Sequence, residues 1–483
     1  MALALVLVPL AFALLVIALP SNRWRPLCVS VGGAAHLALT LVALNLPEVT
    51  GLGGWLLLDP MARLVLLLTS TLFFLCSLYA RGYLAFHSEL SNRVFCACML
   101  GFIGVLTLVV EAQHLGLMWV AIETTTLVSA PMLTFNRDRR SLEAAWKYLL
   151  IGSVGIALAL LGSLFLAYSA LRSGLTPSLL ASDMVHDAPL LSRPWLRSAF
   201  VMLFIGYGTK MGLAPMHTWK PDAYGEAPGV VGTLLAGGLT NCAFLAILRF
   251  YAICISAGDS GFARDLMIVA GLLSMAVAGV FMARQKDIKR MLAYSSVEHM
   301  GILVLGMGIG GGAVFGSMLH MLNNGLTKGV LFLSAANVQR AYASKSTDEV
   351  RGALQRVPIS GALMLAGFFA ITGSPPFGPF LSEFTILNSA ISEGRYLIAA
   401  LFLGLLAVVF IGMGATVLTV VQGTPSERAS VSTFRDGFST AAPPLILMAL
   451  VLLLGVYVPQ PVETLVRNAA SVFEFHAAVA EAP

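Results

Sequence analysis

Ionisable side chains stand inside long apolar runs of this chain. Lys210 lies within the run 200–216, and Glu123 lies in the middle of another. Glu383 follows the Gly- and Pro-rich stretch 373–379. Because an ionisable group at the centre of a membrane costs about 3 kcal/mol, such groups usually line an ion path. A lysine that separates from a carboxylate and rejoins it can release and recapture a proton. These residue types therefore indicate proton transfer.

Other polar side chains occupy similar positions. His320 and Lys328 are eight residues apart, so they lie on roughly one face of a helix. Glu298 and His299 begin a further apolar segment, and His217 ends the first run. Histidine suits a proton relay, because it titrates near neutral pH. The alternatives are a structural hydrogen bond at a helix end for His217, and an interfacial ion pair for Glu298 and His299.

Lys147 has two interpretations. It follows Glu143 at helical spacing, near the cytoplasmic start of its apolar segment. It can be a surface lysine paired with that glutamate, its stem lying along the apolar surface. It can instead lie in the ion path beside Glu123. The sequence leaves both interpretations open.

Composition defines the class of protein. The chain has 483 residues, of which 58% are hydrophobic and 11% charged, against about 25% charged in soluble proteins. We therefore predict an all-α polytopic membrane protein. The six cysteines match no iron–sulfur or zinc spacing, and no nucleophilic triad or basic cluster stands out. We expect no cofactor, no metal and no nucleic acid partner for this chain, and we expect the first apolar run to be a retained helix.

Apolar segments long enough to cross a bilayer number about fourteen. The seventh and twelfth are interrupted by glycine and proline and lie five segments apart, which is typical of an inverted repeat. We expect no long lateral helix after the last segment. The predicted segments are 2–20, 27–46, 61–80, 94–112, 114–135, 146–171, 198–218, 228–250, 265–283, 291–311, 313–337, 358–390, 396–421 and 442–459.

These segments predict four parts of the chain. Residues 1–93 hold the first three helices, 94–250 the first five-helix repeat and 251–421 the second. Residues 422–483 hold helix 14 and the tail. Lysine and arginine are about three times as frequent after odd-numbered segments as after even-numbered ones. By the positive-inside rule, both termini face the non-cytoplasmic side.

Three motifs carry a family resemblance. The stretch 210–223 reads KMGLAPMHTWKPDA, 287–296 reads DIKRMLAYSS and 378–384 reads GPFLSEF. Together they resemble the antiporter-like, proton-conducting membrane subunits of respiratory complex I, over about residues 55–425. The resemblance implies fourteen helices in two inverted five-helix units, with discontinuous helices 7 and 12 and a polar axis across the membrane centre.

The resemblance also implies roles for particular residues. Glu123 matches the acid of the fifth helix, Lys210 the lysine of the seventh and Glu383 the terminal acid of the twelfth. Lys147 matches a lysine often found in the sixth helix. Lys328 resembles the eleventh-helix lysine of some branches.

The sequence differs from the complex I subunits in two places. Asn241 stands where several members have a lysine, so that the amide with bound water would have to bridge the path. The motif at 293–301 reads AYSSVEHMG. With a glutamate at this place, the motif resembles that of component F of hydrogenase-4 and formate hydrogenlyase complexes.

The sequence therefore predicts a non-catalytic, proton-translocating subunit of a redox complex of the group 4 hydrogenase or complex I kind. Its expected partners are other membrane subunits, peripheral hydrogenase-like or iron–sulfur subunits, and the lipid of a bacterial inner membrane. The alternatives are a subunit of a multi-subunit sodium/proton antiporter, a quinone-binding membrane subunit, or a structural anchor. The translocated ion is a proton in the first reading and sodium in the second.

Overall fold

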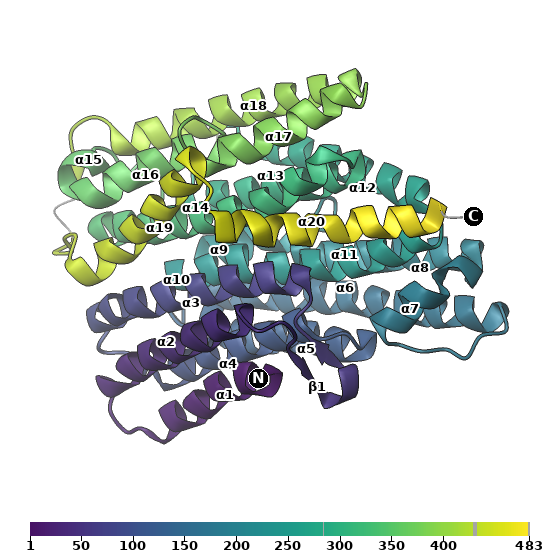
Figure 1. Cartoon of the computed structure of the whole chain (residues 1–483). Helices are drawn as coiled ribbons and strands as arrows, with labels where there is room; N and C mark the ends of the chain where they lie inside the picture. The colour runs from purple at the N-terminus through teal and green to yellow at the C-terminus, as the bar shows by residue number, and fades with distance from the viewer. Residues whose placement is uncertain (284, 428–431, 482–483) are drawn as a thin grey trace.

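A bundle of helices makes up almost the whole molecule (Figure 1). The computed structural model describes residues 1–283, 285–427 and 432–481. Arg284 and Arg428 lie outside the described residues. Both were counted among the lysines and arginines that follow odd-numbered predicted segments. The strands of the described chain, β1 (Thr50–Gly51) and β2 (Leu56–Leu57), form one short antiparallel hairpin.

Four helices form the N-terminal part. They are α1 (Ala2–Ala18), α2 (Trp24–Leu44), α3 (Pro60–Phe86) and α4 (Arg93–Glu111). The α1 helix packs on α4, and α2 packs on α3. The N-terminus of α3 is well defined, because the Asp59 side chain accepts a hydrogen bond from the Ala62 amide at 2.7 Å.

The first predicted break is present. After α5 (Leu115–Leu133) and α6 (Arg139–Arg172), the helix α8 (Arg193–Met211) stops and α9 (Trp219–Glu226) follows. Gly212 ends α8 because it adopts φ +83°, a left-handed conformation that favours glycine. The predicted seventh segment is therefore discontinuous, and Lys210 lies in the last turn before the break.

The next segment is one helix that contains an irregular turn. The helix α10 (Gly229–Leu234) passes through a π-helical turn, Leu235–Leu239, into α11 (Thr240–Ser256). This segment is wholly buried in the bundle. Asn241 lies directly after the π turn, a type of irregularity that is frequent at functional sites.

The second predicted break is also present. The helices α12 (Ser260–Met282), α13 (Ile288–Ile309) and α14 (Gly312–Tyr342) precede it. The helix α16 (Pro358–Ile371) then stops, and α17 (Gly378–Ser392) carries the chain onward. The α13 and α14 helices lie inside the bundle, so almost all of their side chains are buried.

The C-terminal part corrects one expectation. After α18 (Tyr396–Val421) and α19 (Phe438–Val456), residues Gln460–Glu481 form a 22-residue helix, α20. We had expected helix 14 and a tail over residues 422–483, without a long lateral helix, and the part of this tail from 460 to 481 is helical. The α20 helix lies across α3, α11 and α14 (Figure 1). Its stability has a local source in the exposed ion pair of Glu463 with Arg467 at helical spacing.

The remaining short elements connect the long helices. Residues 173–197 contain α7, which packs on α11, and residues 348–357 contain the one-turn helix α15. Figure 1 shows α7 and α15 at opposite ends of the bundle. These elements are η1 (Leu52–Gly54), α7 (Ala181–Asp187), η2 (Ala188–Leu190) and α15 (Ala353–Arg356).

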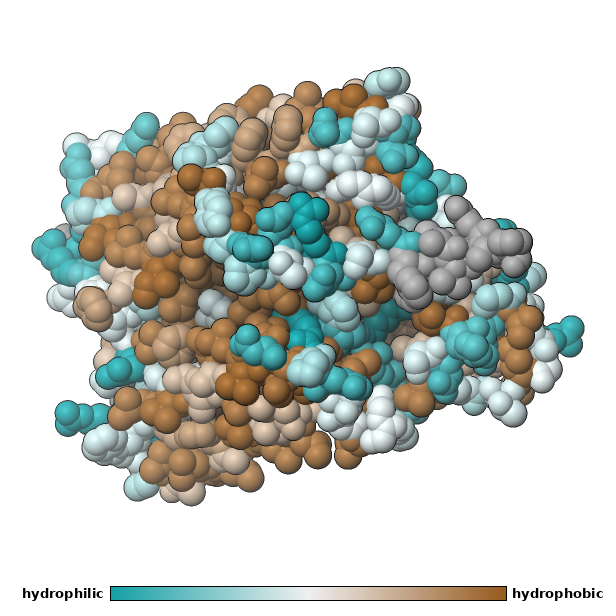
Figure 2. Space-filling view, viewed as in Figure 1, coloured by the Kyte–Doolittle hydropathy of each residue, from teal (hydrophilic) through white to brown (hydrophobic). Residues whose placement is uncertain are grey.

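The surface is that of a membrane protein. Within the described residues, ten helices are long and apolar enough to cross a membrane. Figure 2 shows hydrophobic surface over most of the visible bundle, and many large apolar side chains are exposed. The α8 and α14 helices fall outside the ten, although they fill central positions in the bundle. The number fourteen and the inverted repeat stay predictions.

Candidate functional site

Glu123 and Lys210 meet through a hydroxyl group in the first half of the bundle. The Lys210 ammonium donates a hydrogen bond to Thr126 Oγ1, and the Thr126 hydroxyl donates to Glu123 Oε2 at 3.4 Å. Lys210 lies within electrostatic reach of Glu123. The predicted acid–lysine pair is therefore present, with Thr126 standing between its members.

Neighbouring helices shape this pair. Ser153 of α6 donates a hydrogen bond to Glu123 Oε1 at 2.7 Å. The Lys210 Nζ lies 4.9 Å from the centre of the Tyr148 ring, a distance typical of a cation–π contact. Tyr148 in turn shares a hydrogen bond of 2.8 Å with Ser129. Lys210 is 1% exposed, so these contacts replace water around its charge.

Lys220 is a functional candidate that sequence reasoning missed. The predicted seventh segment ends at residue 218 and leaves Lys220 in a loop, yet α9 places it inside the bundle with no exposed surface. Its Nζ donates to the Met211 carbonyl at 2.7 Å and to the Ser296 carbonyl at 3.4 Å. The first carbonyl belongs to the residue after Lys210, and the second belongs to α13. Lys220 therefore connects the two halves of the site.

Lys328 continues the line in the second half. Its Nζ donates to Ser295 Oγ at 2.7 Å, and Ser295 precedes the residue that Lys220 contacts. Lys328 lies within electrostatic reach of Glu298. Both side chains are buried, which makes an interfacial position for Glu298 wrong. The cause is helix length: α13 begins at Ile288, so Glu298 falls in its middle.

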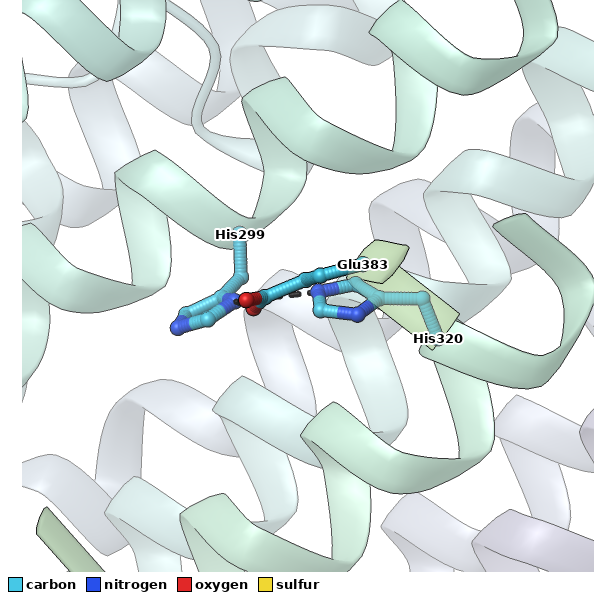
Figure 3. Close-up of side chains that lie close together, drawn as sticks. All are labelled: His299, His320 and Glu383. Carbon is cyan, nitrogen blue, oxygen red and sulfur yellow. Dashed lines mark hydrogen bonds and ion pairs between the residues drawn. The ribbon is translucent and has the colours of Figure 1, made fainter. Parts of the chain in front are cut away.

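Two histidines and Glu383 form the far end of the line (Figure 3). His299 Nδ1 and His320 Nε2 are 3.0 Å apart, and their rings stack with centroids 5.1 Å apart. His299 Nδ1 also lies 4.0 Å from Glu383 Oε1. On the other side of its ring, His320 Nδ1 lies 2.9 Å from the hydroxyl of Ser382. Helices α13, α14 and α17 each supply one of the three titratable groups.

This cluster is arranged for proton exchange. The 3.0 Å contact requires one imidazole nitrogen to donate and the other to accept, so a proton is shared between them. We had expected no metal-ligating arrangement from the sequence. The three groups converge within 4.8 Å, a donor set that divalent transition metals also use. Sequence spacing could not show this, because the groups are 21 and 63 residues apart in the chain.

Several buried polar atoms along the line have no hydrogen-bond partner among the described residues. They are suited to hydrogen bonds with water, because buried polar groups are usually satisfied. These atoms occur from the helix break of the first half to the far end of the second. They include His217 Nδ1, Asn241 Oδ1, Glu298 Oε2, His299 Nε2, both side-chain polar atoms of Asn324, and Glu383 Oε1.

Three predicted residues lie apart from these contacts. Lys147 is at the surface, where its Nζ pairs with Glu143 at 2.9 Å and Asp222 at 3.0 Å. The structure thus favours the surface interpretation of Lys147 over a position beside Glu123. Asn241 is buried and donates to a carbonyl of its own helix at 2.8 Å. His217 is buried near Tyr294, with ring centroids 6.3 Å apart.

Comparison with known proteins identifies the family. A family model described as "NADH:quinone oxidoreductase/Mrp antiporter, TM" matches residues 112–411, more than half of the chain. The chain belongs to this family. The prediction of an antiporter-like membrane subunit is confirmed. The matched range holds every titratable residue of the line described above.

Individual relatives agree with this assignment. The hydrogenase-4 component F homolog of Methylacidiphilum infernorum is 36% identical over 419 residues, covering 84% of this chain and 86% of the relative. NADH-quinone oxidoreductase subunit N of Desulforudis audaxviator is 30% identical over 388 residues, covering 77% of this chain and 75% of the relative. A chain of the membrane-bound sulfane sulfur reductase, an archaeal respiratory membrane complex, has the same fold, with a TM-score of 0.87, 22% identity and 99% coverage of both chains.

Proposed function

We propose that this protein moves protons across the membrane as a subunit of a multi-subunit redox complex. The observation that supports this most strongly is a line of titratable groups that are all buried except Glu123, which is partly exposed. It begins at Glu123 on α5 and ends at Glu383 on α17, so it crosses the centre of the bundle. Its members are Glu123, Lys210, Lys220, Lys328, Glu298, His299, His320 and Glu383.

The Glu123–Lys210 pair would control the proton. When the two charges are close, the carboxylate stabilises the protonated ammonium. When Glu123 moves away, Lys210 is left as an isolated buried cation, a state that membrane proteins avoid. The proton would then pass toward Lys220. Coupling to a partner subunit requires that redox turnover favour one of these two states over the other.

Water would complete the line between the side chains. Lys220 donates to the backbone carbonyl of Met211, the residue after Lys210, and a carbonyl cannot pass a proton on by itself. The partnerless atoms of His217, Glu298 and Glu383 offer sites for bound water. We propose that Asn241 and His217 hold such water, and that Lys147 acts at the cytoplasmic surface.

Partners and location follow as parts of the same proposal. The relatives named above are components of hydrogenase-4 and NADH-quinone oxidoreductase. We therefore propose that other membrane subunits and a peripheral redox arm bind this chain, and that the chain itself holds no redox cofactor. We also propose a bacterial inner membrane as its location. The excess of lysine and arginine after the odd-numbered predicted segments supports an orientation with both termini on the non-cytoplasmic side.

Proton pumping by the intact complex in sealed vesicles tests this function. The variant Lys210→Ala should abolish redox-driven proton uptake, while assembly of the complex is checked by co-purification. Lys286→Ala is the matched control, because Lys286 is an exposed lysine paired with Asp348 at 3.0 Å. Full pumping by an assembled Lys210→Ala complex would refute the role of this lysine.

The identity of the ion is tested in the same vesicles. Proton uptake should persist when sodium is replaced by choline. Uptake that required sodium would favour a sodium/proton antiporter instead. Unchanged ion flux after neutralising both Glu123 and Lys210 would indicate a structural anchor.

A further inference from the structure

A cavity of about 440 Å³ lies outside the proton line, at the end of the bundle where α3 and α14 finish. It is also bordered by the first residues of α10 and α13. All four of these helix ends adjoin loops that follow odd-numbered predicted segments. They therefore lie on one side of the membrane, which the positive-inside rule assigns to the cytoplasm. The volume is within the usual range of small-ligand sites, about 300–1,000 Å³.

Two buried cations line this cavity. Lys289 is 3% exposed and Arg340 is 8% exposed. Among the described residues, neither makes an ion pair with a carboxylate within 4.0 Å. By contrast, the buried Arg249, which also lies outside the proton line, has an acid 3.2 Å away in Asp59. Burying a charge without a partner is costly.

The nearest acids are already engaged. Asp287 caps α13 through the Lys289 amide at 2.9 Å, and its other oxygen pairs with Lys345 at 3.1 Å. Asp436 accepts hydrogen bonds from the amide and the hydroxyl of Ser360. These contacts leave the positive charge of the cavity wall without a direct counter-ion.

The Arg340 guanidinium is oriented but not fully bonded. Its Cζ lies 4.5 Å from the centre of the Phe434 ring and 5.4 Å from that of Tyr83. Its Nη2 donates to Asn337 Oδ1 at 2.5 Å. Its Nη1 is buried and has no hydrogen-bond partner within the described part of the chain. An arginine held in this way keeps a donor free for an anion.

We propose that this cavity binds a phosphate group. An arginine and a lysine are the usual pair for phosphate, since one offers a fork of donors and the other a point charge. Further hydrogen bonds to the phosphate would come from other polar side chains of the wall, which are His87, Asn136, Gln339, Ser432 and Thr433. Basic pockets between membrane helices on the cytoplasmic side also bind anionic lipid head groups. The phosphate group can thus come from a phospholipid or from free phosphate, and the experiment separates these sources.

The test uses the full chain purified in detergent and two probes. The first probe is inorganic phosphate, whose dissociation constant is measured by titration. The second is phosphatidylglycerol, whose retention by the chain is measured by native mass spectrometry after transfer from mixed vesicles, with phosphatidylcholine as reference. Lys289→Gln and Arg340→Gln each remove one cation. Arg93→Gln is the matched control, because Arg93 is exposed at the same end of the bundle.

Each cavity variant should weaken binding of at least one probe by tenfold or more, and Arg93→Gln should leave it unchanged. Selective loss of phosphatidylglycerol would identify a lipid site, and loss of inorganic phosphate alone would identify a soluble ligand. Arg340→Lys keeps the charge without the fork, and it should retain part of the binding if Arg340→Gln fails to fold. Equal affinity of the parent chain and all cavity variants for both probes would overturn the proposal. The result does not depend on pumping, so it is separate from the proposed function.

Discussion

Thr126 sets the distance between acid and lysine at the scale of single residues. It accepts a hydrogen bond from Lys210 and donates one to Glu123, so it transmits any movement of one group to the other. The sequence predicted the two charged residues but not this hydroxyl. Three threonines follow Glu123 in the chain, and only the spacing of contacts across α5 and α8 selects the third. Lys220 was missed for a related reason: hydropathy assigns residues 219–223 to a loop, whereas they form part of α9 and lie in the interior.

Removing the hydroxyl tests this bridge. Thr126→Val keeps the shape of the side chain but removes both hydrogen bonds. Because a hydrogen bond to a charged group contributes about 1.5–3 kcal/mol, proton translocation should fall roughly tenfold or more. Thr126→Ser is the matched control and should retain most of the activity. Equal pumping by the valine and serine variants would show that the bridge has no part in transport.

The helix breaks are the features that matter at the scale of elements. Both were predicted, because glycine and proline cluster within an apolar run at each of them. A single proline does not suffice, since Pro9 and Pro131 lie inside α1 and α5. The first and last residues of the helices were harder to predict from the sequence. The α6 helix begins seven residues before the predicted segment, since hydropathy does not follow a helix into its polar first turns. The α20 helix was missed because its charged residues and its position after the last apolar segment resemble a tail.

Gly212 holds the first break in place. A Cβ atom at this position would lie 2.5 Å from Lys220 Cδ and 2.8 Å from Lys220 Nζ, and the backbone has φ +83°. Gly212→Ala should therefore lower stability by about 1 kcal/mol or more and displace the Lys220 ammonium. The expected result is a lower melting temperature in detergent together with reduced pumping. Gly174→Ala is the matched control for conformation, because Gly174 has φ +77° with open space around it.

If Gly174→Ala lowers stability but leaves pumping unchanged, backbone strain alone does not reduce pumping. The loss of pumping in Gly212→Ala would then come from displacement of Lys220. If Gly212→Ala pumped at the parent rate, the position of Lys220 would have no bearing on transport.

At the scale of the whole molecule, two groups of helices contribute to one line. Helices α5, α8 and α9 supply its first part, and α13, α14 and α17 supply its last. The sequence could indicate buried charges in both groups, because each stands out within its own apolar run. It could not show that Lys220 and Lys328 approach neighbouring residues of α13, since that contact depends on the packing of three helices far apart in the chain.

The most direct test of this single line is a comparison of its two ends. The number of protons moved per electron is measured in sealed vesicles for Glu123→Gln, Glu383→Gln and the double variant. Groups that act in series should give the same loss in each single variant, and the double variant should lose no more. Two partial losses that add up in the double variant would mean two independent routes, and would contradict a single path through the bundle.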